Sequence, residues 1–173
     1  MASKAQKLSK GQRTASGSPV IGVCATCDPR IDKASRDRAV NIISMTADII
    51  ARSIKLPDRT QPPVVWSDVL VDGEKQADIV AGQFKKAGVN IIVCVPDTWA
   101  FPQLSLISLI QQFPKDTPVN LTCGNSGPKP GVVFTHAASG AIAQYGRLLH
   151  INVGTWADTG IKPVMTESTA ENL

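Results

Sequence analysis

Five short apolar segments alternate with four segments of helical periodicity along the chain. The apolar segments are residues 20–24, 64–66, 89–95, 119–123 and 148–153. Short runs rich in Val and Ile are typical of strands buried on both faces of a parallel sheet. The alternation therefore predicts an α/β fold with an open parallel five-stranded sheet, flavodoxin-like or Rossmann-like, in the strand order 2-1-3-4-5 with helices on both faces.

Between these strands, apolar side chains recur at spacings of three and four residues, which predicts helices. The predicted helices span residues 31–53, 72–86, 103–113 and 132–146. In the second helix, Asp72 is expected to cap the amino end. Ile79, Phe84 and Ala87 are expected to face the sheet. The residues after position 156 show no clear periodicity.

Positive charge is concentrated at the amino end of the chain. The chain has 18 Lys and Arg against 14 Asp and Glu, and residues 1–17 hold four of the basic residues and no acid. We expect residues 1–17 to be a disordered basic tail and residues 18–156 to form the α/β domain. Because that domain is near neutral and has no basic stripe, nucleic acid is not an expected partner. The apolar runs are also far shorter than the ~20 residues of a membrane helix, so no membrane is expected as a partner.

Four cysteines end or follow strands of the predicted sheet, namely Cys24, Cys27, Cys94 and Cys123. Two interpretations are open: reduced structural cysteines of a cytoplasmic protein, or a Cys-based metal or redox module. A zinc site usually shows a second closely spaced Cys pair, which is missing here. Cysteines inside strands also behave as small apolar side chains, so the structural interpretation is favoured.

The strongest candidate site follows the first and third predicted strands, where the loops read Asp28-Pro29-Arg30 and Pro96-Asp97-Thr98-Trp99. In the order 2-1-3-4-5 these strands flank the topological switch point, where open sheets bind their ligands. Arg30 and Trp99 suit a polyol, because a guanidinium donates to several hydroxyls and an indole packs on the C–H face of a sugar. Alternatively, Trp99 is a core aromatic and Arg30 a charge at the helix entry, and the spacing supports both interpretations equally.

A second loop, residues 124–131, precedes the fourth predicted helix and contains three glycines and two prolines. It lacks the signatures of phosphate-binding loops, and its prolines remove backbone donors. We expect it to place Asn125 and Lys129 at the crevice. The chain shows no Ser-His-Asp grouping and no close pair of Glu residues, so neither a catalytic residue nor a metal ligand is assigned.

Read together, three motifs resemble the N-terminal domain of L-fucose isomerase over roughly residues 19–155. They are Ile21-Gly22-Val23 with Asp28-Pro29-Arg30, then Val95-Pro96-Asp97-Thr98-Trp99, then Asn125 with Lys129-Pro130-Gly131. The resemblance implies an aldose–ketose isomerase acting on L-fucose and L-fuculose, or on D-arabinose and D-ribulose, with Mn²⁺ held by later domains. It also implies a hexamer in which this domain lends an Arg and a Trp, here Arg30 and Trp99, to a neighbouring subunit.

We therefore expect a substrate-capping domain that has no activity alone and binds sugar through Arg30, Trp99, Asn125 and Lys129. Its expected partners are the C-terminal isomerase domains and neighbouring subunits, and residues 157–173 are expected to be a linker toward a second domain outside this sequence. The alternative is a stand-alone α/β sugar-binding module without catalysis.

Overall fold

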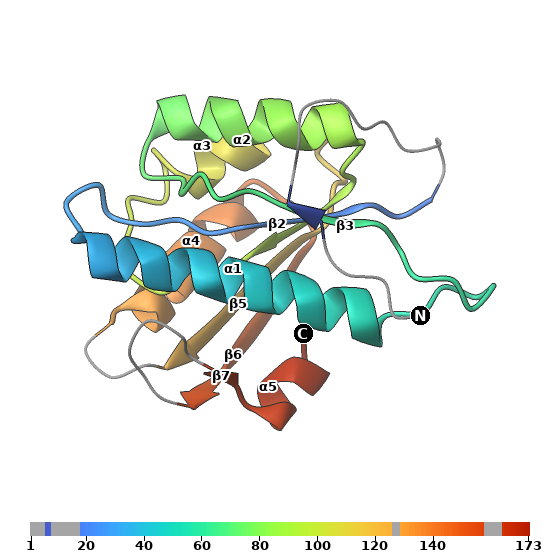
Figure 1. Cartoon of the computed structure of the whole chain (residues 1–173). Coiled ribbons are helices and arrows are strands. Elements are labelled where there is room, and N and C mark those ends of the chain that lie inside the picture. Colours follow the sequence, from blue (N-terminus) through green and yellow to red (C-terminus); the bar gives the residue numbers. More distant parts are fainter. Residues whose placement is uncertain (1–5, 8–17, 126–128, 158–163) are drawn as a thin grey trace.

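The computed structural model describes residues 6–7, 18–125, 129–157 and 164–173. The strands are β1 (Gln6–Lys7), β2 (Ile21–Cys24), β3 (Val64–Trp66), β4 (Ile91–Cys94), β5 (Val119–Asn125), β6 (Leu149–Ala157) and β7 (Val164–Met165). The helices are α1 (Lys33–Ser53), α2 (Glu74–Ala87), α3 (Leu106–Ile110), α4 (Gly131–Gln144) and α5 (Glu167–Glu171). Figure 1 shows the strands as one twisted sheet with helices packed on both sides of it.

The strands form one sheet in the order β1-β3-β2-β4-β5-β6-β7. All neighbours from β1 to β6 are parallel, and β7 is antiparallel to β6. The five predicted strands are β3, β2, β4, β5 and β6, so the predicted order 2-1-3-4-5 is confirmed. The two short edge strands, β1 and β7, have two residues each, which is too short for a hydrophobic period to reveal them.

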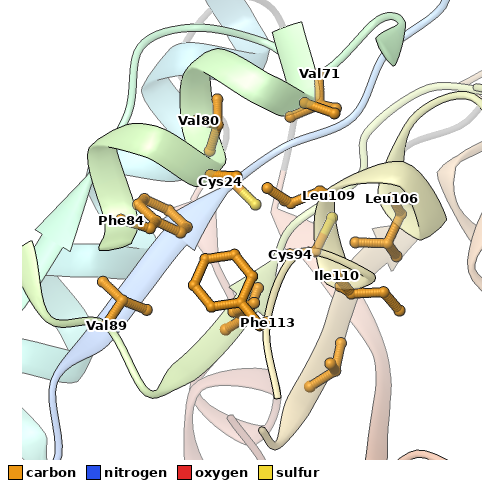
Figure 2. Close-up of a cluster of buried hydrophobic side chains, with 14 of the residues drawn as sticks. Cys24, Val71, Val80, Phe84, Val89, Cys94, Leu106, Leu109, Ile110 and Phe113 are labelled. Atoms are coloured by element: carbon orange, nitrogen blue, oxygen red, sulfur yellow. The ribbon is translucent and has the colours of Figure 1, made fainter. Parts of the chain in front are cut away.

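Two layers of helices cover the sheet. Helix α1 packs on one face with residues near the carboxyl end of the chain, whereas α2, α3 and α4 pack on the other face (Figure 1). Figure 2 shows the second layer, in which Phe84 of α2 and Phe113 lie close to Cys24 and Cys94 of the central strands. Gly22 of β2 allows this packing, because a Cβ there would lie 2.8 Å from the Phe84 ring.

Helix α2 differs from its prediction in two details. Its N-cap is Gly73, and the Asp72 carboxylate accepts a hydrogen bond from Arg36 at 2.9 Å. Ile79 is 43% exposed and does not face the sheet. The buried face of α2 carries Ala77, Val80, Ala81, Phe84 and Ala87.

Helix α3 is shorter than predicted and begins at Leu106. The residues before it form turns, in which the Ser105 N–H and hydroxyl both donate to the Phe101 carbonyl. Ser105 has φ −112° and ψ −92°, outside the helical region, so the helix begins only after it.

The carboxyl end of the chain forms structure that its sequence pattern did not predict. Thr169 of α5 is buried, and its hydroxyl accepts a hydrogen bond from the Thr155 N–H of β6 at 2.8 Å. At the other end, β1 pairs with β3, and the rest of the predicted tail, residues 1–5 and 8–17, lies outside the described residues. Across the part of the chain that the structure describes, no helix has the length and apolarity needed to cross a bilayer.

Candidate functional site

A hollow of about 350 Å³ opens at the carboxyl ends of the parallel strands, where the loops after β2 and β4 meet the start of α4. This volume lies within the range of small-molecule sites. Its lining residues are Asp28, Arg30, Ile31, Thr98, Trp99, Lys129 and Pro130. Three of the four predicted site residues, Arg30, Trp99 and Lys129, therefore lie together in one hollow, at the predicted switch point of the sheet.

Arg30 is held by the carboxylate of Asp28, two residues earlier in the same loop. Its Nε and one terminal nitrogen donate to the two Asp28 oxygens at 2.8 and 2.6 Å, and its backbone N–H donates to Oδ1 at 2.9 Å. This fork lowers the pKa of Asp28 to about 2, because Arg30 stabilises the ionised carboxylate. The Arg30 side chain is 77% exposed, so a ligand in the hollow has access to its guanidinium.

Trp99 contacts the core and also lines the hollow. The ring packs against the core beneath α4, with edge-to-face contacts to Phe101 and Phe134 at centroid distances of 6.4 and 6.3 Å. The same side chain lines the hollow and is only partly buried. Trp99 is thus a rigid aromatic wall, because its core contacts fix the ring that the hollow exposes.

Lys129 reaches the hollow from the loop before α4 and donates a hydrogen bond to the Ser35 hydroxyl in the first turn of α1. Asp32 caps the same turn by accepting the Ser35 N–H at 2.7 Å. This hydrogen bond, with a smaller contribution from the Lys129 charge, lowers the pKa of Asp32. The result is a chain of contacts that ties the α4 loop to the amino end of α1.

Asn125 is the fourth predicted site residue. Its backbone ends β5, in register with Thr155 of β6 and at the same edge of the sheet as the hollow. Its side chain lies outside the described residues, together with residues 126–128, so its role stays a prediction.

The hollow favours binding of a polar ligand over proton transfer. Asp28 has a pKa of about 2 and stays ionised near neutral pH, whereas a general acid or base works best with a pKa near the operating pH. The described residues also contain no group of three His, Cys, Asp or Glu side chains that could hold a metal ion. The Mn²⁺ implied by the family resemblance therefore has no site among them.

The cysteines are buried and unpaired by disulfides. Cys24 and Cys94 face each other in register on β2 and β4, and their hydrogen bond together with burial raises the pKa of Cys24. Burial is also the main cause that raises the pKa of Cys27 to about 12. Because the thiolate is the reactive and metal-binding form, these high pKa values agree with the structural interpretation.

Sequence reasoning did not assign roles to Asp28, Ser35, Arg36 or Thr98. The pairing of Asp28 with Arg30 could have been predicted from the sequence, because an acid and an arginine two residues apart after a strand are within reach of each other. The contacts of Arg36 with the Pro29 carbonyl and the Asp72 carboxylate could not, since they depend on how α1 lies on the sheet.

Fold and site together define an open α/β domain with a polar ligand hollow at its topological switch point. Compared with known families, residues 18–173 match the model for the L-fucose isomerase first N-terminal domain, so the chain belongs to the L-fucose isomerase family. A comparison with curated proteins found no match.

Proposed function

We propose that this chain is the substrate-capping domain of an aldose–ketose isomerase that interconverts L-fucose and L-fuculose, or D-arabinose and D-ribulose. In this role the hollow covers the sugar in the active site of a neighbouring subunit of a homo-oligomer, a hexamer by family resemblance. The observation that carries the proposal is the convergence of Arg30, Trp99 and Lys129 in one hollow of a domain that belongs to this family.

Each of these side chains has a binding task that its chemistry suits. Two of the five N–H donors of the Arg30 side chain are used by Asp28, which leaves three for sugar hydroxyls as far as the described residues go. Lys129 donates to a further oxygen, and the fixed ring of Trp99 packs on the C–H face of the sugar. Proton transfer and metal binding are assigned to the later domains that the family resemblance implies.

The test compares sugar affinity with turnover. The isolated chain is expected to show no turnover with Mn²⁺ and to bind L-fucose or D-arabinose only at millimolar affinity or weaker, measured by NMR shifts of the Trp99 indole and Arg30 Nε signals. In the assembled isomerase, Arg30→Gln should lower kcat/KM about 10- to 100-fold, since a hydrogen bond from a charged donor is worth about 1.5–3 kcal/mol.

Arg52→Gln is the matched control, because Arg52 is an exposed arginine in the last turn of α1. It should leave kcat/KM unchanged. Turnover by the isolated chain would contradict the assignment of catalysis to other domains. Micromolar binding by the isolated chain would instead support the stand-alone sugar-binding module.

A further inference from the structure

We propose that a buried ion pair between Arg38 and Asp97 positions Trp99 for the sugar, so that α1 sets the spacing between the two halves of the hollow. This inference rests on the proposed function, because it concerns how the proposed stacking residue is held. Arg38 and Asp97 are positioning residues, and neither lines the hollow.

The ion pair joins α1 to the loop that carries Trp99. Arg38 Nε donates to Asp97 Oδ2 at 2.8 Å, and the two side chains are 7% and 0% exposed. Asp97 lies two residues before Trp99 and three residues after β4 ends at Cys94. The pair links positions 59 residues apart, so it fixes this loop to a helix that belongs to another part of the chain.

An ion pair in this place is better suited to orientation than to stability. Removing two charges from water is costly, and apolar side chains of similar volume usually stabilise a protein as well as a buried pair. What an apolar pair lacks is direction, whereas a charge-assisted hydrogen bond fixes the distance and angle between its partners. The Arg38–Asp97 ion pair is thus suited to orient the loop that carries Trp99 where it leaves the sheet.

The backbone of Asp97 is also confined from the other face of the sheet. A Cβ at Gly131, the first residue of α4, would lie 2.6 Å from the Pro96 carbonyl oxygen and 3.0 Å from the Asp97 carbonyl. Helices α1 and α4 pack on opposite faces of the sheet (Figure 1). The loop that carries Trp99 is therefore contacted from both sides. Its freedom is small, and a change at Arg38 or Asp97 is transmitted to Trp99.

Helix α1 braces the Arg30 loop in the same way. Arg36, two residues before Arg38, donates to the Pro29 carbonyl at 3.0 Å and to Asp72 at 2.9 Å. Two arginines of one helix therefore hold the two loops that present Arg30 and Trp99.

In the test, the chain is labelled with 5-fluorotryptophan and its ¹⁹F NMR spectrum is recorded. The spectrum of Trp99→Phe lacks one line, which identifies the Trp99 signal among those of the three tryptophans. The deciding variant is Arg38→Met with Asp97→Leu, which removes both charges and keeps apolar volume. We expect the Trp99 line to shift or broaden while the Trp66 and Trp156 lines stay in place. Asp97→Asn alone should move the Trp99 line as well. If Asp97→Asn fails to fold, the double variant alone tests the positioning role.

The matched control is Asp37→Asn, which breaks the exposed Lys33–Asp37 pair on the same helix and should move none of the three lines. An unmoved Trp99 line in the folded double variant would overturn the positioning role. Sugar titration separates this failure from failure of the proposed function. If Trp99→Phe itself leaves sugar binding unchanged, the proposed function is wrong, whatever the double variant does to the Trp99 line.

Discussion

At the scale of single residues, the site depends on how its charges are paired. Arg30 is exposed and flexible by nature, yet Asp28 holds three of its N–H groups, two from the side chain and one from the backbone. Pro29 lies between them and restricts the loop backbone. A long side chain that is ordered before the ligand arrives loses less conformational entropy on binding, so the Asp28 clamp favours affinity.

The stabilisation by the Asp28–Arg30 pair is expected to depend on pH. Asp28 has a lowered pKa in the folded chain, about 2, so the stabilisation by the pair is present above the ordinary pKa of 3.8 and is lost as pH falls toward 2. In Arg30→Gln we expect the pKa of Asp28 to rise toward its ordinary value of 3.8. Carbon-detected NMR titration of the carboxyl groups measures this directly.

Arg52→Gln serves as the control for that titration and should leave the Asp28 pKa in place. A pKa of Asp28 that stays near 2 in Arg30→Gln would show that the Arg30 side chain is not the main cause of the shift, since the backbone N–H of residue 30 is kept in this variant.

At the scale of elements, the amino end of α4 lies close to the loop that carries Trp99. Gly131 touches the backbone of the Trp99 loop, and backbone atoms cannot move aside as a flexible side chain does. Gly140, later in the same helix, has no atom within 4 Å of the position that a Cβ would take. A side chain at position 131 would therefore clash with the Trp99 loop, whereas a side chain at position 140 would meet no neighbouring atom.

We predict that Gly131→Ala destabilises the chain by about 1–3 kcal/mol, as overpacking of a close contact does. Gly140→Ala should instead stabilise it by up to about 1 kcal/mol, since alanine is the better helix former and meets no clash. Urea unfolding followed by circular dichroism measures both values. Equal effects of the two substitutions would contradict the close approach of α4 to the Trp99 loop.

At the scale of the whole molecule, the sheet topology brings together loops that are distant in sequence. The loops after β2 and β4 lie side by side because these strands are neighbours, and α1 and α3 leave them toward opposite faces. The hollow between them is a natural ligand site, and it carries donors and an aromatic wall rather than a cluster of metal ligands among the described residues.

We therefore predict that the isolated chain takes up no stoichiometric Mn²⁺. After equilibration with MnCl₂ and gel filtration, electron paramagnetic resonance should detect far less than one bound manganese per chain. Asp28→Asn is the control, because Asp28 is the acid that lines the hollow, and residual signal in that variant reports nonspecific binding. One manganese per wild-type chain that is lost in Asp28→Asn would contradict the absence of a metal site.

The sequence by itself determined the strand order, the switch point and three of the residues that meet there. Apolar runs and helical periods are local patterns, and a parallel sheet then dictates which loops share an edge. The Asp28–Arg30 pair is likewise a local contact, two residues apart.

Only the tertiary structure decided which distant groups hold those residues in place. Ser35 and Lys129 are 94 residues apart, and Arg38 and Asp97 are 59 apart. Whether such pairs meet depends on the rotation of α1 about its axis and on its position over the sheet, which the packing of the whole core sets. The same reason explains the errors at α2, where Ile79 turned outward and Asp72 paired with Arg36 instead of capping its own helix.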